Sequence, residues 1–222
     1  MAKSKSVYVC CECGAQTAQW LGRCPNCGKF GTLVEEITES AAPQKAVKRE
    51  RSVSAKRPVP LSEVKEERYS RVSSGIAELD TVLGGGIVPG SLVLIGGDPG
   101  IGKSTLLTEV SAHLSEKHRV LYVSAEESCS QVKMRCSRLK LDSSNLLLLN
   151  ETCLEDIEEA IEDEKFVVID SIQAVYASEL SSAAGSVGQV RECAGKLQRI
   201  AKGRGITFFI VGHVTKEGAL AG

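Results

Sequence analysis

Short continuous apolar runs recur through the chain from residue 91 onward. They lie at 91–96, 119–125, 146–149, 166–171 and 206–212. Runs of this length without polar alternation are typical of strands that are buried on both faces, as in a parallel sheet. The pattern therefore predicts an α/β core with a mainly parallel central sheet.

Segments with the apolar spacing of helices separate these runs. We expect helices over 105–114, 127–140 and 154–165, and a further helix after a small polar loop at 176–188. The seven acidic residues of 154–165 and the basic residues of the last helix are expected on solvated faces. The apolar face of the last helix is predicted to contain Val190, Ala194, Leu197 and Ile200 or Ala201.

A composition break divides the chain into three parts. Residues 41–60 carry six Lys or Arg and one Glu among Ala, Pro, Ser and Val, which predicts a flexible basic linker. Such a linker either touches nucleic acid or is simply solvated. It separates a small unit at 1–40 from a core at 61–222, where a short helix with Ile76, Leu79 and Leu83 is expected to end at three glycines.

Bulk composition excludes some classes of protein. The 222 residues carry a formal net charge of −1, so charge as a whole predicts no nucleic-acid partner, although a local basic surface is compatible with it. There is no run of 18 apolar residues for a membrane span, and the basic N-terminus has no apolar core of a signal peptide. We expect a cytoplasmic protein without a membrane partner.

One motif predicts nucleotide binding. The sequence from Gly97 to Thr105 fits G-x-x-x-x-G-K-[ST], and it stands between a predicted strand and a predicted helix as the motif requires. Glycines let backbone N–H groups approach phosphate oxygens, and the helix N-terminus adds partial positive charge. Lys103 is then a charge for the β- and γ-phosphates, and the Ser104 hydroxyl is a ligand for Mg²⁺. The predicted ATP-binding residues are Gly97, Asp98, Pro99, Gly100, Ile101, Gly102, Lys103, Ser104 and Thr105.

Acidic residues follow two of the predicted strands. The run 119–125 ends in Glu126 and Glu127, and the run from residue 166 reaches Asp170. Because the carboxyl ends of parallel strands form the ligand-binding edge of such a sheet, we interpret Glu126 as the base that activates water. Glu127 is expected merely to start the next helix. Asp170 is expected to hold Mg²⁺ in the manner of a Walker B acid.

The last predicted strand delivers His213 to the same edge. A polar residue at this position can sense the γ-phosphate, and the alternative is a histidine that only packs at the strand tip.

Cysteines crowd the first 27 residues. Cys10 and Cys13 form one C-x-x-C pair, Cys24 and Cys27 form another, and each pair is followed by glycine. Four thiolates at this spacing predict a closed, structural Zn²⁺ site that supplies the folding energy of a small unit. A rubredoxin-type iron centre or disulfides are the alternatives, and Cys11 could replace a neighbour.

The single tryptophan, Trp20, stands between the two cysteine pairs. It is either an exposed anchor for a partner or a nucleic-acid base, or a packing residue in a unit short of apolar mass; we favour packing.

Together these motifs resemble one family. The cysteine finger with Trp20-Leu21-Gly22-Arg23-Cys24, the loop 96–105, the segment Val123 to Ser128, Val168 to Ser171 and Gly212 to Gly218 are similar to the bacterial RadA (Sms) family of RecA-like DNA-repair ATPases. The resemblance covers nearly the whole chain except the linker. It implies a RecA-like P-loop core preceded by a four-cysteine zinc finger.

The resemblance also implies a function. Members of the family are DNA-dependent ATPases that work with RecA as hexameric rings on single-stranded or branched DNA and drive branch migration. The loop 176–188 and Lys216 would then face DNA or a neighbouring subunit. The family continues beyond this sequence with further strands and a Lon-protease-like domain, so we expect a fragment whose own ATPase activity is weak. The alternative is an ATP-gated signalling or partner-recruiting protein without motor activity.

Overall fold

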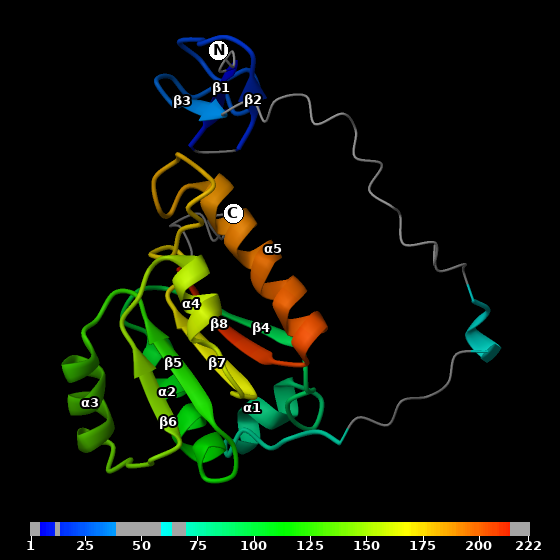
Figure 1. Ribbon diagram of the computed structural model, residues 1–222, viewed down its shortest axis with the longest axis vertical. Helices are drawn as coiled ribbons and strands as arrows, with labels where there is room; N and C mark the ends of the chain where they lie inside the picture. The colour runs from blue at the N-terminus through cyan, green and yellow to red at the C-terminus, as the bar shows by residue number, and fades with distance from the viewer. Residues whose placement is uncertain (1–4, 12–13, 39–58, 64–69, 214–222) are drawn as a thin grey trace.

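The computed structural model in Figure 1 describes residues 5–11, 14–38, 59–63 and 70–213. The N-terminal unit is a three-stranded antiparallel sheet with the strand order β2-β1-β3. Its strands are β1 (Lys5–Cys10), β2 (Gln16–Thr17) and β3 (Leu33–Thr38). Its small core contains Cys10, Cys24 and Leu33, so few apolar side chains stabilise it.

The second unit is built on a five-stranded sheet in which every neighbouring pair is parallel. The order is β4-β8-β7-β5-β6, so the two strands that are neighbours in sequence, β4 and β5, are separated in the sheet by β8 and β7. All five predicted strands are confirmed. They are β4 (Leu92–Gly97), β5 (Val120–Ser124), β6 (Leu146–Leu149), β7 (Phe166–Asp170) and β8 (Thr207–His213).

Helices cover both faces of this sheet (Figure 1). Apolar side chains of α2 and α3 pack in one cluster with the strand residues that point to one face of the sheet. Apolar side chains of α4 and α5 pack in a second cluster with the strand residues that point to the other face. The result is the three-layer α/β/α core that continuous apolar strands require. The helical elements are a 3₁₀ turn (Leu61–Glu63), α1 (Ala77–Val82), α2 (Lys103–Ser115), α3 (Cys129–Arg138), α4 (Leu154–Ala160) and α5 (Val187–Arg204).

Strand register places the chemistry on one edge. Gly97 at the end of β4 pairs with His213 at the end of β8, and Ser124 at the end of β5 pairs with Asp170 at the end of β7. Successive side chains of a strand point to opposite faces. Phe166 and Val168 belong to the cluster of α2, so Asp170, which follows at the same parity, points toward that face as well.

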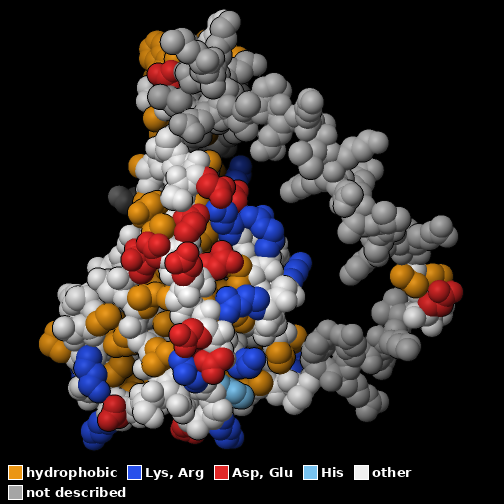
Figure 2. Space-filling view, viewed as in Figure 1, with side chains coloured by type: hydrophobic (Ala, Val, Ile, Leu, Met, Phe, Trp, Pro, Cys, Tyr) orange, Lys and Arg blue, Asp and Glu red, His pale blue; other side chains and the backbone are white. Residues whose placement is uncertain are grey.

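Some helix boundaries differ from the prediction. Helix α4 ends at Ala160 because Ile161 is extended and buried rather than helical. Glu164 is 2% exposed, which contradicts the expected solvated acidic face at that position. It accepts hydrogen bonds from Arg119 and from the Glu162 N–H, at 2.9 and 2.7 Å. Other acidic side chains gather over α4 beside the Lys and Arg side chains of α5 (Figure 2).

Helix α5 begins earlier than expected. Ser186 is its N-cap and accepts a hydrogen bond from the Gln189 N–H, so Val187 and Gly188 belong to the helix rather than to the preceding loop. Cys193 and Gln189 are buried on its inner face, whereas Ala194 is only half-buried. None of the helices in the described ranges is long and apolar enough to cross a membrane.

Candidate functional site

The glycine loop connects the end of β4 to the start of α2. Gly100 and Gly102 have φ angles of 80° and 101°, a left-handed conformation that favours glycine. A Cβ at either position would meet no atom within 4 Å, so the loop lies open at both glycines. The first N–H groups of α2 have no carbonyl partner within the helix and are available to an anion.

Lys103 folds over this loop. Its side chain is buried, and Nζ donates hydrogen bonds to the carbonyl oxygens of Gly97 and Asp98, each at 2.8 Å. The ammonium group is thereby held inside the turn of the loop. The N–H groups of the loop and this lysine fit the phosphates of a nucleoside triphosphate. The remaining groups of such a site must come from other side chains at the same sheet edge.

Asp170 is buried on the face of the sheet that α2 covers. It is 7% exposed, and its Oδ2 accepts a hydrogen bond of 2.5 Å from the Tyr122 hydroxyl. Burial and the neighbouring carboxylate both raise the pKa of Tyr122, so this phenol stays a donor at neutral pH. Ser104, the expected Mg²⁺ ligand, lies in the first turn of α2 on the same face. Carboxylate and hydroxyl oxygens are suitable Mg²⁺ ligands.

Glu126 follows β5, next to the strand that carries Asp170. Its Oε1 accepts a hydrogen bond from the Ser171 hydroxyl and lies 3.5 Å from His213 Nε2. In the part of the chain that the structure describes, Oε2 has no hydrogen-bond partner, and the side chain is 48% exposed. The carboxylate is therefore held from one side and open to solvent on the other.

His213 is in contact with this carboxylate rather than packed away from it. Its Nδ1 is buried without a partner among the described residues, as is Oε1 of the nearby Gln173. Gln173 Nε2 donates to the His213 carbonyl at 3.4 Å. Such buried polar atoms without a partner, here on His213 and Gln173, are the kind of feature that a bound polar group satisfies.

Glu127 does not start a helix, contrary to the prediction. Helix α3 begins at Cys129, and Ser128 caps it through a capping box with Gln131. Glu127 instead forms an ion pair with Arg135, whose side chain is 10% exposed. Both residues, with Thr105 of the glycine loop, line a hollow of about 460 Å³; its other lining residues are Gln131, Met134 and Arg138.

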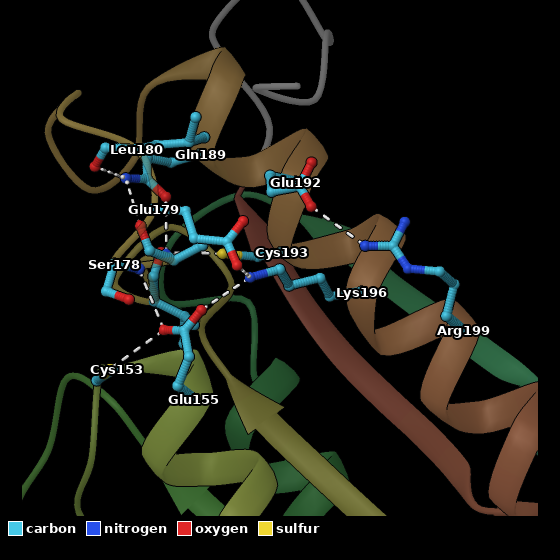
Figure 3. A network of polar contacts seen from close by, with 12 residues as sticks. Cys153, Glu155, Ser178, Glu179, Leu180, Gln189, Glu192, Cys193, Lys196 and Arg199 are labelled. Carbon is cyan, nitrogen blue, oxygen red and sulfur yellow. Dashed lines mark hydrogen bonds and ion pairs between the residues drawn. The ribbon is translucent and has the colours of Figure 1, made fainter. Parts of the chain in front are cut away.

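Two sets of side-chain contacts fasten the loop between β7 and α5 (Figure 3). In the first, Gln189 is fully buried, and its side chain bonds to the backbone of Ala177, Leu180 and Ser182. In the second, Lys196 Nζ lies 2.8 Å from Glu155 and 3.2 Å from Glu179. The expected solvated basic face of α5 is therefore wrong at Lys196, which is only 16% exposed.

Three of the predicted metal ligands converge in the N-terminal unit. The sulfur atoms of Cys10, Cys24 and Cys27 lie within 4.8 Å of one another, and Cys10 and Cys27 are 3.7 Å apart. Tetrahedral Zn²⁺ with bonds of about 2.3 Å places its sulfur ligands about 3.8 Å apart, so the three thiolates fit the ion. Cys13 lies outside the described residues, and the exposed Cys11 is not in the cluster.

The two cysteine pairs form matching turns. The Gly14 N–H donates to the Cys10 carbonyl at 2.8 Å, and the Gly28 N–H donates to the Cys24 carbonyl at 3.0 Å. Both glycines have positive φ, at 69° and 73°. The repeated turn supports the predicted pairing by C-x-x-C motifs.

Trp20 contradicts the expectation of a packing residue. Its side chain is 59% exposed, as are large parts of the apolar side chains of Leu21 and Phe30. Lys216, which the resemblance assigned to DNA or a neighbouring subunit, lies outside the described residues.

Comparison with known proteins assigns the chain to a family. A profile described as an AAA domain matches residues 56–219, and one described as a rubredoxin metal binding domain matches residues 8–35. The DNA repair protein RadA of Halalkalibacterium halodurans is 52% identical over 225 residues, and its Bacillus subtilis counterpart is 50% identical over 226 residues. The chain belongs to the RadA family. Each alignment covers 100% of this chain and 49% of the relative, so the chain spans about half the length of these relatives.

A solved structure supports the fold of the RadA-family core. The KaiC-like protein PH0186 of Pyrococcus horikoshii OT3 superimposes with a TM-score of 0.57, covering 69% of this chain and 74% of that one. At 22% identity, the likeness concerns the fold alone. It confirms the predicted RecA-like core, and the matched metal-binding profile and the cysteine cluster support the predicted Zn²⁺.

Sequence reasoning missed three residues of the site. Tyr122, Ser171 and Arg135 each contact a predicted acid or its neighbour. The signal for Tyr122 was a hydroxyl inside an apolar strand, two residues before the strand's polar end. A buried tyrosine needs a partner for its hydroxyl, and the acid of the adjacent strand is the nearest one.

Proposed function

We propose that this RadA-family chain is the ATP-hydrolysing part of a DNA-repair protein. The observation that carries the proposal is the position of Glu126, held by Ser171 and His213 at the sheet edge where the glycine loop also ends. A carboxylate with one oxygen bonded and the other open can align a water molecule and take its proton. The names of the relatives, DNA repair protein RadA, support the biological role.

Each residue of the edge would then have one task. The glycine loop and Lys103 bind the β- and γ-phosphates and offset their charge. Ser104 and Asp170 would hold Mg²⁺, which supplies further charge neutralisation when bound, and Tyr122 fixes the orientation of Asp170. His213, beside Glu126, would report the presence of the γ-phosphate. The hollow beside Thr105 gives the rest of the nucleotide a place outside the loop.

We infer single-stranded or branched DNA as the second ligand. The fastened loop before α5 leads away from Ser171, so it is suited to carry a change at the site to a bound strand. Lys216 follows β8 and is proposed as a contact to DNA or a neighbouring subunit. Cooperation with RecA, a hexameric ring and branch migration belong to the same proposal and concern the longer protein.

Hydrolysis in matched variants tests the proposal. Glu126→Gln is expected to reduce ATP turnover about 100- to 10,000-fold, because a general base contributes that much, while ATP binding persists. Lys103→Ala is expected to abolish both binding and turnover. Glu109→Gln, a change of the same kind at an exposed position of α2, serves as the control.

The outcome for Glu126→Gln decides the assignment of the base. Turnover equal to that of the control would refute Glu126 as the base. Turnover that is unchanged by single-stranded DNA, both here and in the longer protein, would favour a signalling or partner-recruiting role over a DNA motor.

A further inference from the structure

The N-terminal unit exposes an aromatic surface with a cation in it. Trp20 is 59% exposed and Phe30 is 76% exposed, and the guanidinium of Arg23 lies 5.5 Å from the centroid of the Phe30 ring. We call Trp20, Leu21, Arg23 and Phe30 the aromatic face. Exposed aromatic rings that do not contribute to the core of so small a unit point to a binding role.

The backbone brings these residues close to one another. Arg23 and Phe30 are directly opposed in an antiparallel bridge, and the Gly31 N–H donates to the Gly22 carbonyl at 3.0 Å. Trp20 lies beside Gly22, the residue before Arg23, because a Cβ on Gly22 would be 3.8 Å from the indole ring. Directly opposed residues present their side chains on the same face.

Arg23 is held in position rather than solvated at random. Its Nε donates to the Gly28 carbonyl at 2.7 Å, within the turn that carries two of the metal ligands. The metal site therefore fixes the geometry of the aromatic face. A guanidinium positioned beside a ring loses little entropy on binding, which favours recognition by stacking.

The charged residues in the segment that carries this face are all basic. Between Gly14 and Val34 the only charged residues are Arg23 and Lys29, and there is no Asp or Glu. The charge is thus locally positive in a chain whose formal net charge is −1. Aromatic rings with a guanidinium beside one of them are complementary to unpaired bases joined by phosphates.

We propose that the aromatic face binds single-stranded nucleic acid by stacking bases on Trp20 and Phe30, with the guanidinium of Arg23 beside Phe30. This site would be separate from the nucleotide site, and it extends the DNA role of the proposed function without requiring hydrolysis. A base presents a flat π-face that stacks on an aromatic ring whatever its sequence. The proposal accordingly predicts binding with little sequence preference.

Trp20 is the only tryptophan of the chain, so its fluorescence reports on this site directly. Titrating the full chain, without ATP, with a short single-stranded deoxyoligonucleotide is expected to quench this fluorescence to saturation. Phe30→Ala is expected to weaken binding about tenfold, as the loss of one stacked base does, and Arg23→Gln is also expected to weaken it. Leu61→Ala, at an exposed apolar residue outside the N-terminal unit, is the control and is expected to bind normally.

An oligonucleotide of the same length with abasic sites has the same phosphates but no rings. Weak quenching by this probe supports stacking, whereas equal quenching by both probes overturns it. Equal affinity of Phe30→Ala and the control, with zinc content unchanged in both, also overturns the proposal. No quenching by any oligonucleotide would overturn it in favour of a protein partner. In that case, ATP turnover measured separately on the same protein preparation would show whether the proposed function stands.

Discussion

Gln189 offers the sharpest test of how the loop before α5 is held. Its Oε1 accepts from the Ala177 N–H at 2.8 Å, and Nε2 lies within 3.0–3.3 Å of the carbonyls of Ser182, Leu180 and Ala177. An amide has two N–H groups, so at most two of these three contacts are full hydrogen bonds at once. Gln189→Leu keeps the shape and removes one accepted and two donated bonds.

The magnitude follows from these three bonds. At a net value of about 1 kcal/mol each, the substitution should lower the free energy of opening this loop by about 3 kcal/mol. That corresponds to roughly 150-fold faster exchange of the Ala177 amide hydrogen, if exchange follows the population of the open loop. Gln198→Leu is the matched control, because Gln198 is exposed on the same helix and its change should stay within about 0.5 kcal/mol.

Hydrogen exchange resolved to the Ala177 amide measures the effect where it arises. Global unfolding by urea is a secondary readout, since the chain contains two units that need not unfold together. If the Ala177 amide is equally protected in Gln189→Leu and Gln198→Leu, the bonds seen in Figure 3 do not hold the loop and the reasoning fails.

Two further predictions concern single side chains. Burial opposes ionisation of Glu155, but hydrogen bonds from Lys196 and the Ser178 N–H outweigh it and lower its pKa from 4.5 to about 2. A lowered folded-state pKa gives stability that is present above pH 4.5 and lost as the pH falls toward 2. Glu155→Gln should therefore reduce the loss of unfolding free energy between these pH values, measured by unfolding curves at each pH. The control Glu158→Gln, at an exposed position, should not. Tyr122→Phe removes the donor to Asp170 and should raise the Mg²⁺ concentration for half-maximal ATP turnover about tenfold; an unchanged Mg²⁺ dependence would contradict the proposed role of Asp170.

The glycine loop and the acidic residues of the site could be predicted from the sequence because they depend on local patterns. The glycine loop is a contiguous motif, and the acids at Glu126 and Asp170 each end an apolar run, so a parallel sheet brings them to one edge. The structure confirms that the two strands end at the same edge, because Ser124 at the end of β5 pairs with Asp170 at the end of β7.

The partners of these acids could not be predicted in the same way. Tyr122 and Asp170 are 48 residues apart, and Glu126 and Ser171 are 45 apart, so each pair is set by packing between strands rather than by a motif. Glu164 shows the converse error. Its acidic neighbours led to the prediction that its side chain is exposed to solvent. Instead, the helix ends before Ile161, and the buried Glu164 carboxylate accepts a hydrogen bond from Arg119.

The nucleotide site and the fastened loop are joined by one short buried segment. Ser171 contacts Glu126, and from there the chain runs through Ile172, Val175 and Ala177, which are at most 3% exposed. Close-packed side chains transmit displacement rather than absorb it, because they have no free volume to move into. A shift of Ser171 with the state of Glu126 must therefore displace the loop or break the bonds of Gln189. Loosening these bonds should weaken the proposed coupling to DNA while leaving ATP binding intact.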